Sequence, residues 1–170
     1  MNYKLIYTKR RSIGAYIKDG GLIVRAPYGV SVGIIEEFLQ KHKNWIEKNL
    51  QIDGKRKEKE DSLTDTEIKK LKKEARKYLT GKTAYFSNIM GLKYGRITIT
   101  SAKTRFGSCS SKGNISYSYR LMLYPERARE YVVVHELAHL VEMNHSKRFY
   151  LVVEKILPDY KERKRLLKTL

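Results

Sequence analysis

Apolar and polar residues alternate along the first 26 residues in a pattern that predicts three short β-strands. The expected strands cover residues 3–8, 13–17 and 22–26, and a polar turn, Lys18-Asp19-Gly20-Gly21, separates the last two. Because the strands follow one another closely, we expect a β-meander. Over residues 31–50 the apolar positions recur mostly at helical spacing, which predicts a helix that covers one face of this sheet.

A change in composition separates this region from the rest of the chain. Residues 52–62 are charged and nearly devoid of apolar side chains, which favours a linker or a mobile loop. We therefore expect residues 1–51 to form an N-terminal cap unit of β-meander and helix, and residues 63–170 to form a second unit.

The second unit begins with a helical pattern and continues with strand patterns. A long helix is expected from Thr64 or Asp65 to about residue 90, with a break at Gly81. Residues 96–100 and 114–119 each alternate in hydrophobicity, and a Gly- and Ser-rich loop lies between them. This arrangement predicts a pair of antiparallel strands.

Three further helices are expected in the remaining part of the chain. The first covers residues 126–143 and is apolar on nearly every side, so that it is expected to be buried. The second covers residues 146–157, and the third begins at Asp159. The fold class predicted by the whole pattern is α+β.

The composition narrows the class of protein. Of the 170 residues 41% are hydrophobic, but no stretch approaches the roughly 20 consecutive apolar residues of a membrane span. The N-terminal residues lack the apolar core and cleavage site of a signal peptide. The single cysteine, Cys109, excludes an intramolecular disulfide and a cysteine-based zinc finger. We therefore expect a cytoplasmic protein without a membrane partner.

The net charge of +18 is large for a chain of this size. A positive field of this strength attracts polyanions, such as nucleic acid or nucleotides, and acidic substrates. The lysines and arginines are spread along the whole chain and do not identify one of these partners, and a solvated basic surface is an equally good interpretation.

Candidate chemistry is concentrated in the sequence His135-Glu136-Leu137-Ala138-His139. Two histidines four residues apart on a helix project from one face about 6 Å apart, which suits binding of a single metal ion. Glu136 lies one step further round the helix, where it can accept a proton from a water on that ion. This pattern predicts a Zn²⁺-dependent hydrolase with Glu136 as the general base.

A catalytic zinc site needs a third protein ligand, and His145 is the best candidate. In a continued helix His145 would lie about 240° round from His139, facing away from the metal. The helix must therefore end before His145, and Asn144 and Ser146 are residues typical of a helix end and a helix start. Three of the four histidines in the chain lie in this segment, and His42 is interpreted as a surface residue.

An ordered set of motifs extends along nearly the whole chain. It comprises Thr104-Arg105-Phe106-Gly107-Ser108-Cys109-Ser110, Arg120-Leu121, Pro125, residues 131–139 and Asn144-His145-Ser146-Lys147-Arg148-Phe149, and, in the N-terminal unit, Arg10-Arg11-Ser12, Val24-Arg25-Ala26-Pro27 and Trp45-Ile46. In this order the motifs resemble those of the YgjP-like (SprT-related) metallopeptidase family. The resemblance implies a minimal zincin-like domain that contains an antiparallel sheet and an active-site helix, with ligands His135, His139 and His145 and the base Glu136.

Two departures from related patterns qualify the resemblance, and one alternative ligand stays open. Phe106 stands where the family usually has tryptophan, a change that keeps an aromatic side chain. Glu142 stands where a metzincin has a helix-ending glycine, and no methionine follows His145, which argues against that class. A carboxylate ligand from the next helix, as in gluzincins, would have to be Glu154.

Further residues are candidates for contact with substrate. By analogy with zincins, the strand after the loop 105–110 forms the rim of the cleft and pairs with an extended peptide. Tyr117, Tyr119 and Arg120 lie on or after that strand, and one of them is a candidate to stabilise the oxyanion of a tetrahedral intermediate. The tyrosines are also well explained by ordinary sheet packing, and Cys109 by a small buried thiol.

The function that we predict from the sequence is therefore a zinc metallopeptidase that cleaves a peptide or protein substrate. Two alternatives stay open. The same activated water could hydrolyse the phosphoanhydride of a nucleotide, which the basic charge would favour. The peptidase could instead act on proteins bound to nucleic acid, through contacts to the phosphate backbone. The sequence does not indicate the oligomeric state.

Overall fold

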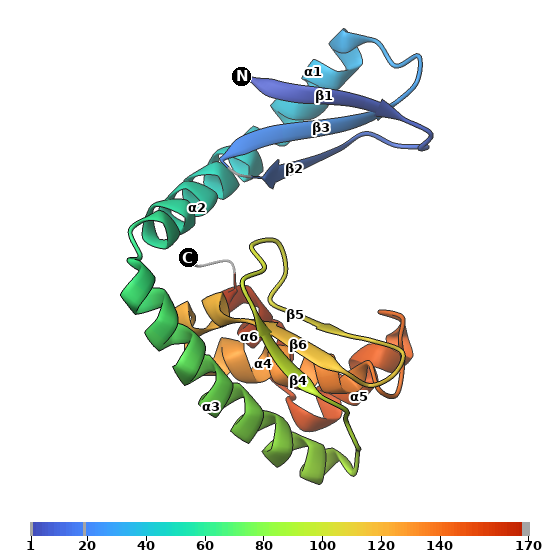
Figure 1. The fold of residues 1–170 in the computed structure, drawn as a ribbon. Helices are drawn as coiled ribbons and strands as arrows, with labels where there is room; N and C mark the ends of the chain where they lie inside the picture. The colour runs from blue at the N-terminus through green and yellow to red at the C-terminus, as the bar shows by residue number, and fades with distance from the viewer. Residues whose placement is uncertain (1, 19, 168–170) are drawn as a thin grey trace. The chain divides into compact units, whose positions relative to one another are not determined.

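The protein is described by a computed structural model that covers residues 2–18 and 20–167 (Figure 1). The chain forms two compact units, of which the first ends at Leu63 and the second begins at Thr64. Each unit contains one three-stranded sheet, and the described residues contain six α-helices. This mixture of helices with two small, separate sheets agrees with the predicted α+β class.

The sheet of the first unit consists of β1 (Tyr3–Thr8), β2 (Gly14–Lys18) and β3 (Gly21–Pro27), in the order β1-β3-β2. β3 pairs with β1 in parallel and with β2 in antiparallel orientation. The predicted meander is therefore wrong, because β1 and β2 are not neighbours. The reason is burial: β3 carries three buried residues on one face, Leu22, Val24 and Ala26, and at the centre of the sheet it pairs along both edges.

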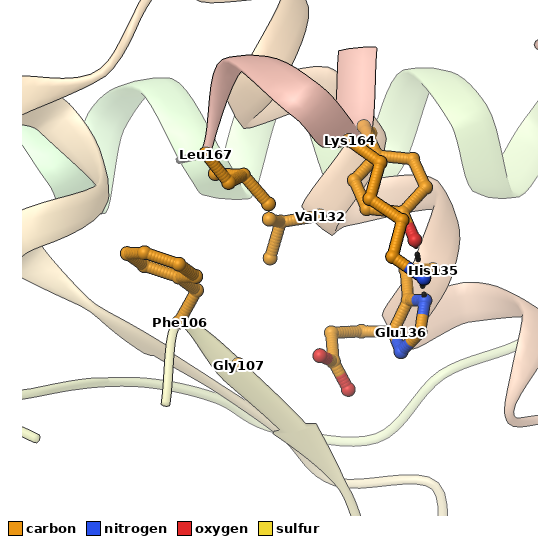
Figure 2. Close-up of a pocket in the computed structure, with 8 residues that line it drawn as sticks. Phe106, Gly107, Val132, His135, Glu136, Lys164 and Leu167 are labelled. Carbon is orange, nitrogen blue, oxygen red and sulfur yellow. Dashed lines mark hydrogen bonds between the residues drawn. The ribbon is translucent and has the colours of Figure 1, made fainter. Parts of the chain in front are cut away.

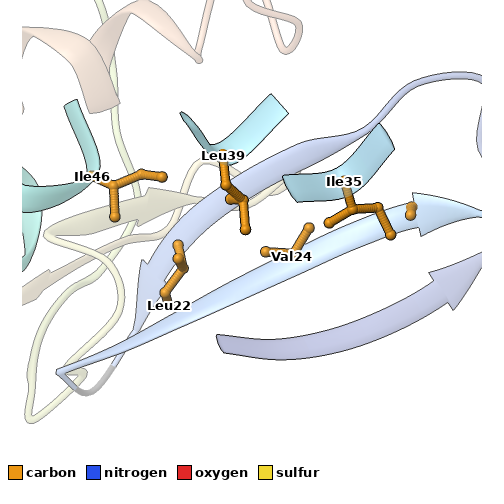
Figure 3. Packing of buried hydrophobic residues seen from close by; sticks show 6 residues of the cluster. Leu22, Val24, Ile35, Leu39 and Ile46 are labelled. Atoms are coloured by element: carbon orange, nitrogen blue, oxygen red, sulfur yellow. The ribbon is translucent and has the colours of Figure 1, made fainter. Parts of the chain in front are cut away.

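Two helices cover that face of the sheet, α1 (Val32–Lys41) and α2 (Lys43–Asp61). Ile35 and Leu39 of α1 and Ile46 of α2 pack on the buried residues of β3, as Figure 3 shows. At a typical gain of roughly 1.5–3 kcal/mol for each large buried side chain, this cluster is the main source of stability of the unit.

The helical region predicted for residues 31–50 differs from the observed one in two ways. It is interrupted at His42, and its second half continues through residues 52–61, which we expected to be a loop. The physical reason is that lysine, arginine and glutamate are strong helix formers even where no apolar face is present. The side chain of Asp53 also accepts a hydrogen bond from the backbone N–H of Gly20, at 2.7 Å, which joins α2 to the turn after β2.

The second unit begins with the long helix α3 (Asp65–Met90), which continues through Gly81 without the predicted break. Its first turn is closed by a reciprocal capping box, in which the Thr64 hydroxyl accepts from the backbone of Glu67 and the Glu67 carboxylate accepts from the backbone of Thr64. Gly91 ends the helix with φ of 65°, in the left-handed region that glycine adopts without strain.

The sheet of this unit consists of β4 (Ile97–Thr100), β5 (Gly107–Cys109) and β6 (Ile115–Ser118), in the order β4-β6-β5. β4 pairs with β6 in parallel, so the predicted antiparallel pair is wrong. The cause is the loop between them, which contains β5. Because β5 is the antiparallel partner of β6, the chain reverses once more and β6 runs in the direction of β4.

The remaining elements are the 3-10 helix η1 (Tyr119–Leu123) and the helices α4 (Glu126–Ala138), α5 (Lys147–Ile156) and α6 (Tyr160–Leu166). As predicted, α4 is buried; it packs against α3, β5, α5 and α6. Among the described residues no helix is both long and apolar enough to span a membrane.

The capping box of α3 gives a first prediction. Replacing Thr64 with alanine removes the acceptor for the Glu67 backbone N–H and should lower the free energy of unfolding by about 1 kcal/mol. Urea denaturation followed by circular dichroism measures the change. Thr66→Ala, at an exposed position in the same turn, is the matched control, and equal stability of the two variants would contradict the proposed role of the cap.

Candidate metal centre

The end of α4 determines where the histidines lie. The helix ends at Ala138, earlier than expected, and His139 follows as its C-terminal cap residue. The chain then turns, and the Ser146 hydroxyl accepts a hydrogen bond from the backbone N–H of Phe149 to begin α5. Because the helix ends before it, His145 returns towards α4, and its Nε2 lies 3.0 Å from Nε2 of His135.

The structure thus brings together the three predicted ligands. One nitrogen from each of His135, His139 and His145 can be chosen so that all three lie within 4.8 Å of one another. The ring of Phe149, which is fully buried, packs against all three imidazoles, with centroid distances of 4.8, 4.6 and 4.8 Å in that order. Phe149 therefore provides a rigid wall that restricts the ring positions.

The other nitrogens of two of these rings have partners of their own. Nδ1 of His139 donates to the backbone carbonyl of Glu142 at 3.2 Å, which leaves Nε2 without a proton. Nδ1 of His135 lies 3.4 Å from the hydroxyl of Tyr131. Partners of this kind fix the orientation of metal-binding histidines, so Glu142 and Tyr131 are candidates for that role.

Burial keeps two of the imidazoles, those of His135 and His139, neutral. It lowers the pKa of His135 to about 3, with smaller contributions from the neighbouring His139, His145 and Lys164. Burial also lowers the pKa of His139. Only the neutral ring has a free nitrogen lone pair, so these side chains are ready to act as ligands without losing a proton.

Glu136 lines a pocket together with His135 and is only 5% exposed. Burial raises its pKa to about 8, against the opposing effect of the positive charge of Arg105. It faces a pocket of about 360 Å³ that also contains His135 (Figure 2). The pocket is lined by Phe106, Gly107, Tyr131, Val132, His135, Glu136, Lys164 and Leu167.

Glu136 is also in close contact with β5. A Cβ atom added to Gly107 would lie 2.5 Å from Oε1 of Glu136 and 2.7 Å from its Cγ, closer than atoms in proteins approach without a shift. The carboxylate therefore occupies space that is open only because residue 107 has no side chain. The sequence motif contained Gly107, but its contact with Glu136 could not be predicted because it depends on how β5 packs on α4.

The spacing of the nitrogens fits a metal ion. With zinc–nitrogen bonds of 2.0–2.1 Å, two ligands of a tetrahedral site lie about 3.3 Å apart. The His135 and His145 nitrogens are already close to this spacing. Three imidazole nitrogens match the number of protein ligands that catalytic zinc sites use, in contrast to the four ligands of structural sites.

The other predicted residues lie as follows. The hydroxyl of Tyr117 is 3.0 Å from that of Thr83 in the core, and the ring of Tyr119 packs under the guanidinium of Arg120. Arg120 donates to the carbonyl of Ser101 at 2.6 Å. The oxyanion role suggested for Tyr117, Tyr119 and Arg120 stays a prediction.

Two further residues considered in the sequence analysis are not part of the histidine cluster. Glu154 is exposed on α5 and is not among the described residues whose ligand atoms converge. Cys109 is half-buried, and burial raises the pKa of its thiol, so it stays protonated at neutral pH.

Comparison with known proteins identifies the family. The model of the YgjP-like metallopeptidase domain matches residues 51–170. The chain belongs to the YgjP-like metallopeptidase family. Membership implies a metal ion, and the three converging histidines are residues that could bind it.

Two other comparisons accompany this result. No curated protein matches the chain. Among solved structures it is similar to the metallopeptidase zymogen of Pyrococcus abyssi abylysin, with 27% sequence identity and a TM-score of 0.49, over 54% of this chain and 92% of that one.

The geometry of the cluster predicts that His145 contributes to metal affinity. Replacing it with alanine should weaken zinc binding at least about a hundredfold, since a change in a mere supporting residue already costs 10- to 100-fold. Competition with a chromophoric chelator measures the affinity. His42→Ala is the matched control, because His42 lies outside the cluster with Nδ1 2.7 Å from the carbonyl of Phe38. Unchanged affinity in the His145 variant would exclude this residue as a ligand.

Proposed function

We propose that the protein is a zinc-dependent peptidase with a zincin-like active site. In this proposal His135, His139 and His145 hold the ion and Glu136 is the general base. The observation that carries it is the convergence of three imidazole nitrogens within 4.8 Å beside a buried carboxylate that faces a pocket. A three-ligand site with an adjacent base is the arrangement that hydrolysis by an activated water requires.

The donor set supports zinc as the ion. Magnesium and calcium prefer oxygen ligands, whereas imidazole suits zinc and related transition metals. Zinc held in such a site would acidify a water molecule and polarise the carbonyl of the substrate. The remaining work of catalysis falls to residues of the chain.

Glu136 is placed to transfer the protons. As a general base it takes a proton from the attacking water, and as an acid it then gives that proton to the leaving nitrogen. Its raised pKa of about 8 in the absence of an ion makes it a stronger base than an exposed glutamate. The charge of Arg105, together with that of a bound cation, favours the ionised form that must accept the proton.

Strand β5 is placed to align a peptide. It is an edge strand, paired only with β6 within its sheet, and its residue Gly107 both contacts Glu136 and lines the pocket. An extended substrate could add to such an edge by backbone hydrogen bonds, which would hold the scissile bond next to Glu136 without reading its sequence. This assigns the substrate-binding rim to β5, which precedes the strand expected from the sequence.

We prefer peptide hydrolysis to nucleotide hydrolysis because the chain belongs to a metallopeptidase family. Hydrolysis of a nucleotide phosphoanhydride would also use an activated water, so it is tested beside peptide cleavage. Action on proteins bound to nucleic acid requires peptidase activity first.

The role of Glu136 is tested by its replacement with glutamine, which keeps the shape but cannot accept a proton. The zinc content should stay at one ion per chain, and peptide cleavage should fall by about 10²- to 10⁴-fold. Mass spectrometry of cleaved casein-derived peptides measures activity, and elemental analysis measures zinc. Peptide cleavage that survives both this change and chelation would refute the proposed mechanism. So would a Glu136→Gln protein that loses nucleotide hydrolysis but keeps peptide cleavage.

The contact between Gly107 and Glu136 gives a second test. In Gly107→Ala the new methyl group should displace the carboxylate, so that cleavage falls by about tenfold to a hundredfold while zinc affinity is retained. Gly81→Ala is the matched control: an added Cβ there meets nothing within 4 Å, and alanine inside α3 should not weaken the helix. Full activity of the Gly107 variant would show that the carboxylate does not need its observed position.

A further inference from the structure

A basic surface with two aromatic rings lies beside the metal centre. Tyr150 of α5 and Tyr160 of α6 stack with a centroid distance of 5.8 Å. Nζ of Lys164 lies 5.4 Å from the centre of the Tyr150 ring, and Nζ of Lys161 lies 5.8 Å from that of Tyr160. Together with Arg165 these residues line a cavity of about 230 Å³. We call this set of five residues the α6 basic surface.

The α6 basic surface is continuous with the pocket that contains Glu136. Lys164 lines both cavities, and Figure 2 shows it next to His135. The α6 basic surface also approaches the histidine cluster, because the ring of Tyr150 lies 6.4 Å from that of His145. A molecule that occupies the pocket beside Glu136 would therefore contact Lys164, the residue that both cavities share.

The charges of α6 are divided between two sides of the helix. Its acidic residues are engaged by arginines: Asp159 pairs with Arg127 and Arg163, and Glu162 lies 3.4 Å from Arg127. In contrast, no carboxylate within the described ranges forms an ion pair with the three cations of the α6 basic surface. Their charges are therefore available to a ligand.

The wall of the neighbouring pocket has a different character. Phe106, Val132 and Leu167 give it an apolar side, and Glu136 is the one acidic residue among the described residues that line it. A further cation, Arg105, is close enough to Glu136 to influence its pKa. The site thus offers one apolar compartment and an excess of positive charge around it.

We propose that the α6 basic surface is an anion subsite that selects peptides with a carboxylate close to the cleaved bond, next to an apolar residue whose side chain enters the pocket. This inference rests on the proposed peptidase function and names its substrate class. The carboxylate can belong to an aspartate or glutamate side chain or to the C-terminus of the peptide, since both present the same group to Lys161, Lys164 and Arg165.

A nucleotide fits the same surface less well. Its phosphates could pair with the lysines and its base could stack on Phe106, but its sugar hydroxyls and the polar edges of its base would find no hydrogen bonds from Phe106, Val132 and Leu167. An apolar side chain loses nothing in that position. The combination of an apolar pocket and a separate basic surface therefore favours an acidic peptide.

The experiment compares matched peptides that differ only in charge. All peptides contain the same apolar residue. In each pair, one position after that residue is glutamate in one member and glutamine in the other, and this position is moved along the peptide from pair to pair. Every peptide is made with a free and with an amidated C-terminus. Two readouts are used: kcat/KM for cleavage by the zinc-loaded protein, and the affinity for the Glu136→Gln protein measured by fluorescence anisotropy. The acidic member of the best pair should be preferred roughly tenfold at low salt, with the preference decreasing as ionic strength rises. Comparison of free and amidated ends identifies the source of the carboxylate.

A double variant tests the residues. Lys161→Gln with Lys164→Gln should reduce the preference, measured as the ratio of kcat/KM for the acidic peptide to that for the glutamine peptide, to about twofold or less. Lys69→Gln with Lys73→Gln is the matched control, because it removes the same charge from exposed positions of α3. The control should retain the preference.

Three outcomes would overturn the inference. The first is equal use of acidic and neutral peptides by the wild-type protein. The second is an equal loss of preference in both double variants, which would assign it to the overall charge. The third is that replacing Lys161 and Lys164 reduces the hydrolysis of nucleoside triphosphates but leaves the preference for acidic peptides unchanged. Failure of the peptidase proposal itself looks different, because then no peptide is cleaved at all.

Discussion

The end of helix α4 is the constraint on which the candidate site depends. His135 and His139 share one helical face, but His145 can reach them only if the helix stops and the chain reverses. The chain does so after Ala138, and the capped start of α5 at Ser146 then holds the returning segment. The approach of His145 to His135 is a result of these two helix boundaries and needs no long-range pairing of strands.

Phe149 links this local geometry to the packing of the unit. It lies on the first turn of α5, is fully buried, and contacts all three imidazoles. The same helix that redirects His145 therefore also supplies the surface against which the rings rest. Burial lowers the pKa of His135 and of His139, and the ring of Phe149 is one of the groups that pack against them.

Much of the site could be predicted from the sequence because its signals are local. The spacing of His135 and His139, and the helix-ending and helix-starting residues around His145, are read within eleven positions of the chain. In contrast, the contact of Glu136 with Gly107 depends on how β5 packs on α4, and the pocket depends on the position of α6. No local pattern contains that information.

The errors in the fold have the same origin. Periodicity located β1, β2, β3, β4 and β6 to within a few residues, but it does not state which strands are neighbours. β5 has only three residues and shows no alternation long enough to detect, and missing it reversed the expected direction of β6. For residues 52–61 we predicted a loop because the segment has no apolar stripe. The structure has a helix there, because the residues themselves have high helix propensity.

The division of charges on α6 has a consequence for tolerance of acid. The lysines near the metal centre keep their place because the opposite side of the helix is tied to α4, through Asp159, Arg163 and Glu130. Hydrogen bonds from Arg127 and Arg163 lower the pKa of Asp159 to about 2, from an ordinary value of 3.8. Its contribution to stability is complete above the ordinary value and is lost only as the pH falls towards 2. The anchoring of α6 by Asp159 is thus maintained under mildly acidic as well as neutral conditions.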